Sequence, residues 1–275
     1  MTKRRSFIYY LMMITVVITW GLDPIVNSKF YEYFSASALA SLSTFCALIL
    51  FLVISIKKLR HFNKSYFKIA LPICMINSLA CILQRIGLQY TTPASYAFLE
   101  QLACVVVPFA SFIFTKKRPS LTQASASVVC LIGCLIFTGV LESGFSLNAG
   151  TLLCASAGIL FGVCISATGA FTKELDIGLY MILHMASYFL VSASMATALN
   201  FIAPNRVPIE AFKFSFSATL IIPAILFGLF SVGFCWLLKN EATRNINPTA
   251  VAIIAPFSPS NEINLDICSL KQSML

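Results

Sequence analysis

Long apolar stretches separated by short polar connectors fill almost the whole of this chain. An α-helix rises about 1.5 Å per residue and the hydrocarbon core of a bilayer is about 30 Å thick, so about 20 apolar residues make one crossing. The stretches are continuously apolar rather than alternating, which excludes membrane-spanning strands. A ninth stretch, Ile246–Pro259, is too short to span alone. The eight stretches predicted to be transmembrane helices are Phe7–Leu22, Ser35–Ile56, Ile69–Tyr90, Ala94–Thr115, Leu121–Leu141, Ala149–Phe171, Leu179–Ile202 and Phe216–Leu238.

Composition favours an all-α polytopic membrane protein over a soluble one. Apolar residues make up 59% of the chain and charged residues only 11%, whereas soluble domains carry about 25% charged residues. The net charge of +9 does not indicate nucleic acid as a partner, because the basic residues are spread over the connectors rather than gathered on one face. The basic N-terminus leads into an apolar run without a small-residue cleavage site, so this run is predicted to be a retained first helix.

The connectors also predict the orientation, because Lys and Arg gather in cytoplasmic loops. With the N-terminus inside, fourteen of the 19 basic residues lie inside and three lie outside. The protein is therefore predicted to sit in the cytoplasmic membrane with a cytoplasmic N-terminus. The inside set is Lys3, Arg4, Arg5, Lys57, Lys58, Arg60, Lys64, Lys68, Lys116, Lys117, Arg118, Lys173, Lys239 and Arg244.

The chain divides into a first repeat of five helices (7–141) and a second, incomplete repeat (148–259), followed by a polar tail (260–275). Because five is odd, the second repeat enters the membrane inverted, an arrangement found in transporters with a midplane substrate site between the repeats. Thr92–Ser95 before the fourth helix is echoed by Asn247–Ala250 before the ninth.

Small residues predict helix contacts, since they let helix backbones approach closely in lipid. Gly158 and Gly162 form such a pair on the sixth helix. The cysteines are interpreted as packing residues. Cys130 and Cys134 share a helix face, but two thiols without a histidine are weak evidence for a metal, and no metal or cofactor is predicted.

Several motifs, taken in order, resemble the EamA type of the drug/metabolite transporter superfamily over residues 7–259. Their order and spacing carry the resemblance more than any single motif. It implies a secondary transporter with ten helices, whose cavity is lined by the first four helices of each repeat. The motifs are Thr19–Gly21, Gly87–Ser95, Pro108, Pro119–Gln123, Gly133 and Gly139.

The chain departs from that family in two places. Lys116–Arg118 stands where many members have an acidic residue, and the tail 260–275 cannot span a membrane, so the tenth helix is missing from the pattern. The tail is interpreted as a frameshift, a premature stop or a mispredicted gene end. The alternative function is therefore a non-functional remnant, or a membrane-embedded partner of another subunit.

Charged groups inside a bilayer cost about 2.5–3.5 kcal/mol on insertion scales, so each is a candidate functional residue. Glu100 lies in the fourth helix and Arg85 late in the third, and the short turn between these helices predicts that the two side chains meet as an ion pair. We hypothesise that Glu100 binds a proton or a cationic substrate group and that Arg85 tunes it. The alternative is a static salt bridge that holds the two helices together.

Polar and aromatic residues complete the predicted site. Trp20 and Phe161 occupy comparable places in the two repeats and are predicted to wall a cavity, or else to be packing residues. His184 suits proton coupling, although a hydrogen-bonded histidine in a helix contact is the more common case. The remaining candidates for substrate or proton binding are Gln84, Gln101, Tyr96, Asn77 and Tyr188.

Other charges are predicted to be solvated. Asp23, Lys29 and Glu32 are interpreted as a solvated outer rim that follows the first helix, with the alternative that Asp23 lies at the entrance of the cavity. The inner-face loop charges are Lys173, Lys239, Glu241 and Arg244.

No metalloprotease, nucleophile-elbow or P-loop motif is present in the sequence. An enzyme or an ATP-driven pump is therefore not predicted. The leading hypothesis is a secondary-active carrier, acting as an exporter, that moves a small organic metabolite or drug by alternating access, with possible proton coupling.

Overall fold

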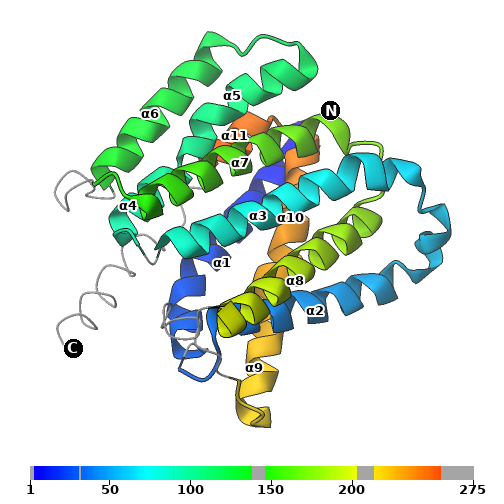
Figure 1. The fold of residues 1–275 in the computed structure, drawn as a ribbon. Helices are drawn as coiled ribbons and strands as arrows, with labels where there is room; N and C mark the ends of the chain where they lie inside the picture. The colour runs from blue at the N-terminus through cyan, green and yellow to red at the C-terminus, as the bar shows by residue number, and fades with distance from the viewer. Residues whose placement is uncertain (1–2, 31, 89, 138–145, 203–213, 255–275) are drawn as a thin grey trace. The chain divides into compact units, whose positions relative to one another are not determined.

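The computed structural model describes residues 3–30, 32–88, 90–137, 146–202 and 214–254, and the regular structure of these residues is helical throughout (Figure 1). The polar tail, and the last residues of the predicted ninth stretch, lie outside this range. The helices are α1 (Lys3–Phe30), α2 (Ala36–Ile54), the 3₁₀-helix η1 (Ile56–His61), the π-helix η2 (Tyr66–Ala70), α3 (Leu71–Leu88), α4 (Pro93–Glu100), α5 (Leu102–Thr115), α6 (Leu121–Phe137), α7 (Ala149–Phe171), α8 (Ile177–Ile202), α9 (Ala218–Gly228), the π-helix η4 (Leu229–Phe234), α10 (Cys235–Asn245) and α11 (Pro248–Ile254).

The prediction of an all-α polytopic membrane protein is confirmed. Two of the eight predicted crossings correspond to shorter apolar helices, Phe7–Trp20 and Leu121–Ile136. Within the described ranges, the runs that are long and apolar enough to cross a bilayer are Ser37–Ile54, Tyr66–Gln84, Ser95–Thr115, Ala149–Phe171, Ile177–Ala198 and Ala218–Asn245.

Two compact units make up the fold. Among the described residues, unit 1 takes its members from the ranges 1–24, 79–173 and 238–275, and unit 2 from the ranges 25–78 and 174–237. Each unit takes helices from both predicted repeats, so the spatial division differs from the division along the sequence. The repeat boundaries themselves stay a prediction.

Unit 1 is built around the close packing of α7 against α4 and α5. A Cβ atom on Gly162 would lie 2.7 Å from the Cβ of Val106, and one on Gly158 would collide with the carbonyl oxygen of Leu99. Ser166, one turn further along α7, donates a hydrogen bond of 3.1 Å to the carbonyl of Val107. The predicted small-residue contact on this helix is therefore confirmed, and the partner helices are α4 and α5.

Unit 2 is built around α2, which packs against α8, α9 and η4. Gly228 lies against Ser43, and a Cβ atom on Gly233 would come within 3.3 Å of the Cβ of Ala47. The rings of Phe45 and Phe189 join α2 to α8 with 5.2 Å between their centroids. Small residues thus set the distance between helices in this unit as well.

The two echoed segments start their helices in the same way. The Thr92 hydroxyl accepts a hydrogen bond from the Ser95 N–H at 3.1 Å, and Pro93 is the first residue of α4. The Asn247 side chain accepts one from the Thr249 N–H at 2.9 Å, and Pro248 is the first residue of α11. A short polar side chain before a proline suits a helix start, because proline lacks the N–H that would have no partner there.

Two predicted helix ends are wrong, and both helices are longer than expected. α1 continues past Leu22 to Phe30, so Asp23 and Lys29 lie within a helix rather than after it. The last long helical run continues past Leu238 to Asn245. Polar residues ended both predicted segments, whereas helix formation depends on backbone hydrogen bonding and tolerates polar residues where the helix packs against its neighbours.

Candidate binding site around Lys239

Lys239 lies on α10 and is buried, with only 7% of its surface exposed. Its ammonium nitrogen lies 5.2 Å from the centroid of the Trp20 ring on α1 and 5.9 Å from that of Phe161 on α7. Both distances fall within the range of a cation–π interaction. The prediction that Lys239 is a solvated loop charge is therefore wrong, whereas Trp20 and Phe161 do lie close to one polar group, as an aromatic cavity wall requires.

Glu100, at the last turn of α4, is the acidic member of this site. Its carboxylate is hydrogen-bonded to the side chain of Gln84 on α3 and interacts electrostatically with Lys239. Glu100 and Gln84 are both half-buried. Arg85 lies within α3, but its side chain is outside the described part of the structure, so the predicted Arg85–Glu100 pair stays a prediction. The described partners of Glu100 are Gln84 and Lys239.

Two buried thiols complete the surroundings of the ammonium group. Cys81 of α3 and Cys164 of α7 are both buried in the neighbourhood of Lys239. The site therefore combines a buried cation, a carboxylate, an amide, two aromatic rings and two thiols. Such a set offers opposite charges and apolar surface to a small solute, as ligand-binding sites commonly do.

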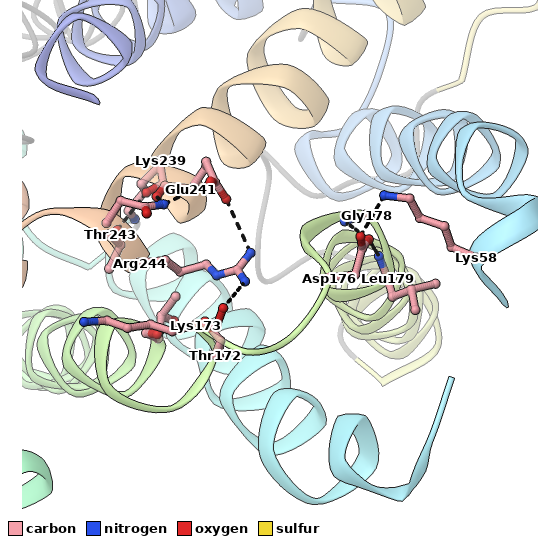
Figure 2. Close-up of polar contacts among 12 residues, drawn as sticks. Lys58, Thr172, Lys173, Asp176, Gly178, Leu179, Lys239, Glu241, Thr243 and Arg244 are labelled. Atoms are coloured by element: carbon pink, nitrogen blue, oxygen red, sulfur yellow. Dashed lines mark hydrogen bonds and ion pairs between the residues drawn. The ribbon is translucent and has the colours of Figure 1, made fainter. Parts of the chain in front are cut away.

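The end of α10 is fixed by a second polar cluster (Figure 2). Arg244, which is 8% exposed, donates to the carbonyl of Lys173 at 3.0 Å and to the carboxylate of Glu241 at 3.3 Å. The Thr243 hydroxyl donates to the carbonyl of Lys239 at 2.7 Å. These bonds connect α10 to the end of α7 and hold the helix turn that carries Lys239. Arg244 was predicted to be a loop charge, and that prediction is also wrong.

The other predicted residues of unit 1 lie on α4 and at the α4–α5 junction. Tyr96 is half-buried on α4. Gln101 is buried between the two helices, and its carbonyl accepts hydrogen bonds from the backbone N–H and the thiol of Cys104 at 3.0 and 2.8 Å. Gln101 thus forms the junction between α4 and α5.

Three predicted residues belong to unit 2. Asn77 is buried, and its Nδ2 has no hydrogen-bond partner among the described residues. His184 is buried between aromatic rings, 4.7 Å from the Trp236 centroid and 6.1 Å from that of Tyr180. Tyr188 is buried one turn further along α8. The proton-coupling role of His184 stays a prediction.

A separate polar cluster in unit 2 surrounds Asp176, just before α8 (Figure 2). Its carboxylate accepts hydrogen bonds from the Lys58 ammonium at 2.7 Å and from the N–H groups of Gly178 and Leu179 at 2.8 and 3.3 Å. Partial burial acts to raise the pKa of Asp176, but the hydrogen bond and charge of Lys58, together with these two N–H groups, hold that pKa below its ordinary value.

Three thiols also gather in unit 1, where Cys130 of α6 is hydrogen-bonded through its side chain to Cys104 of α5 and to Cys134 of α6. No group of three potential metal ligands is arranged to hold an ion among the residues that the structure describes.

Comparisons with known proteins identify the first part of the chain. Residues 7–139 match the model of the EamA-like transporter family, almost the same range as the predicted first repeat. No curated protein matches the chain. A solved structure, "Crystal structure of protein", superposes with a TM-score of 0.69 at 13% identity, covering 95% of this chain and 88% of that one. At this identity the match concerns the fold alone.

Proposed function

Residues 7–139 belong to the EamA-like transporter family, and from this premise we propose that the chain is a secondary-active transporter of a small organic solute, with Glu100 and Lys239 as the charged centre of its binding site. The proposal includes proton coupling at Glu100 and export across the cytoplasmic membrane. It also keeps the N-terminus cytoplasmic, as the distribution of basic residues in the connectors predicts.

The observation that carries the proposal is the position of Lys239 between two aromatic rings and near a carboxylate. The residues involved come from five helices that are far apart in the sequence, and all of them belong to unit 1. Charged groups within a membrane-spanning bundle are costly and commonly serve substrate or ion pathways. The close backbone packing along α7 explains the architecture but supplies no charged group for a solute.

The chemistry follows from the opposite charges of Glu100 and Lys239. While Glu100 is ionised, it interacts favourably with the ammonium of Lys239. A proton on Glu100 removes that attraction and leaves Lys239 able to bind an anionic group of a solute. Conversely, a cationic group of a solute competes with Lys239 for Glu100 and for the ring faces of Trp20 and Phe161. Either exchange couples solute binding to the charge state of Glu100.

Transport by purified protein in proteoliposomes tests this proposal, with a panel of metabolites assayed with and without a pH gradient. We expect Glu100→Gln to abolish the pH dependence and Lys239→Gln to lower uptake at least tenfold, since about 1.4 kcal/mol of lost interaction corresponds to tenfold. The exposed neighbours Glu174 and Lys173 provide matched controls, and Glu174→Gln and Lys173→Gln should transport like the wild type. Unchanged, pH-dependent transport by both site variants would refute the proposal.

A reporter fused within the connector that contains Lys57 tests the orientation separately. A reporter that is active only in the cytoplasm should be active at this position if the N-terminus is cytoplasmic. Two crossings, α1 and α2, precede the connector, and the second returns the chain to the side of the N-terminus. An exterior signal from this position would reverse the proposed orientation without affecting the assignment of the charged centre.

A further inference from the structure

The connector between α2 and α3 carries a cluster of exposed cations. It joins two runs that are long and apolar enough to cross a bilayer, Ser37–Ile54 and Tyr66–Gln84, and its last residues, 66–70, begin the second run. Residues 55–70 contain no acidic residue. Whichever side of the membrane it faces, a short connector between two crossings lies at the level of the lipid headgroups. Its exposed cations are Lys57, Lys58, Arg60, Lys64 and Lys68.

The 3₁₀ geometry of η1 places apolar and cationic residues on different edges of the helix. In a 3₁₀-helix, residues three apart lie above one another. Ile56 and Leu59 therefore form one edge of η1, and Lys57 and Arg60 form the next edge. Ile56 and Leu59 are both exposed, and so is Phe67 just beyond. The connector thus presents cations beside exposed apolar side chains, the pattern of a segment that lies in a membrane interface.

The connector is held in place by contacts within unit 2. Lys58 pairs with Asp176 at 2.7 Å, and the Tyr66 hydroxyl accepts a hydrogen bond from the Asp176 N–H at 2.8 Å. Phe62 stacks on Tyr66 with 4.9 Å between centroids. Lys58 is therefore already paired with an acid of this chain. The other exposed cations of the connector are held on an ordered scaffold.

We propose that this connector is a binding surface for the anionic headgroups of the bilayer. Clustered Lys and Arg side chains immediately beside a transmembrane helix attract anionic lipids. The exposed Ile56, Leu59 and Phe67 favour a lipid surface over free phosphate, because their side chains can reach the acyl boundary while the cations contact the headgroups. Because the cations are spaced along the segment, they can contact several headgroups, whereas a single small anion would contact only a few of them.

Lipid binding by the purified full-length protein tests this proposal. The protein in a neutral detergent is titrated with phosphatidylglycerol or phosphatidylcholine, and retained lipid is counted by native mass spectrometry. We expect the wild type to prefer phosphatidylglycerol, and the triple variant Lys57→Gln/Arg60→Gln/Lys64→Gln to lose about a hundredfold in affinity for it. The triple variant Lys116→Gln/Lys117→Gln/Arg118→Gln removes the same number of exposed charges at another connector and should keep the preference.

The single variants Arg60→Gln and Lys64→Gln are measured alongside, so that the conclusion does not depend on the folding of a triple variant. Each should weaken phosphatidylglycerol binding about fivefold. Three results would overturn the proposal. One is an undiminished preference in the 57/60/64 variants, and another is equal loss in both triple variants, which would indicate net charge alone. The third is full competition by inorganic phosphate at low millimolar concentration, which would indicate a phosphate site.

Discussion

The ammonium of Lys239 lies 5.2 Å from the centre of the Trp20 ring, so a cation near the end of the described chain contacts an aromatic side chain of the first helix. The contact is a cation–π interaction, which contributes about 0.5–2 kcal/mol depending on desolvation. It requires an aromatic face at position 20 but not an indole in particular.

We therefore predict that Trp20→Phe keeps most of the transport activity, whereas Trp20→Ala lowers it. By the cation–π magnitude, the loss in solute affinity for Trp20→Ala should be between about twofold and thirtyfold. The apparent KM for transport in proteoliposomes measures it. Equal activity of the Phe and Ala variants would show that the ring face does not contribute to binding.

Glu100 and Lys239 should be coupled energetically, because they carry opposite charges that interact within unit 1. Removing one charge leaves the other uncompensated, and Lys239 is buried, whereas removing both charges relieves that penalty. We predict that Lys239→Gln and Glu100→Gln each lower the melting temperature in detergent. The double variant should lose less stability than the sum of the losses of the two single variants, with a coupling free energy of about 0.5–3 kcal/mol. Strict additivity would show that the two charges do not interact.

The sequence predicted the helices well, because long apolar runs without internal breaks leave few alternatives in lipid. α7 begins and ends where it was predicted, at Ala149 and Phe171. Its start was well specified, since Asn148 and Thr151 form a reciprocal capping box with bonds of 2.9 Å.

The candidate site around Lys239 was predicted only in part. Glu100, Trp20 and Phe161 were chosen because polar and aromatic groups within apolar stretches are unusual, and the structure places all three around Lys239. Lys239 was missed because its charge was taken as the end of an apolar stretch. The sequence does indicate a longer helix, because no Gly or Pro lies between Leu238 and Pro248. Without such a residue, the helix is expected to continue past Lys239. The three-dimensional partners of a charge cannot be obtained from hydropathy.

The close contact of α7 with α4 gives a stability prediction with an internal control. A Cβ atom at Gly158 would collide with the backbone carbonyl of Leu99, which cannot move aside as a side chain can, whereas one at Gly133 would meet no atom of the described structure within 4 Å. Gly158→Ala should therefore destabilise the protein by about 1–3 kcal/mol through overpacking. Gly133→Ala should be neutral or stabilising by up to about 1 kcal/mol, since alanine favours the helix.

Thermal unfolding of the two alanine variants in the same detergent compares them directly. A similar melting temperature for both variants would indicate that α7 and α4 can separate slightly without loss of stability, contrary to the tight packing at Gly158.

The Asp176–Lys58 pair predicts a pH dependence of stability. Because the folded-state pKa of Asp176 is lowered, its contribution is fully present above the ordinary pKa of about 3.9. It is lost as the pH falls through the lowered folded-state value. Both side chains are partly exposed, so the contribution should not exceed about 1 kcal/mol. Asp176→Asn keeps a side-chain oxygen that can accept from the N–H groups of Gly178 and Leu179 but removes the charge that pairs with Lys58.

We therefore predict that Asp176→Asn has a lower melting temperature than the wild type at pH 7, and that this gap narrows progressively below about pH 4. Lys58→Met, which removes the same ion pair from its other side, should show a comparable deficit at pH 7. The two curves should then converge on that of the wild type as Asp176 becomes protonated. A gap that stays constant from pH 7 to pH 3 would mean that the carboxylate acts only as a neutral acceptor at the start of α8, and that the charge of Lys58 contributes nothing to stability.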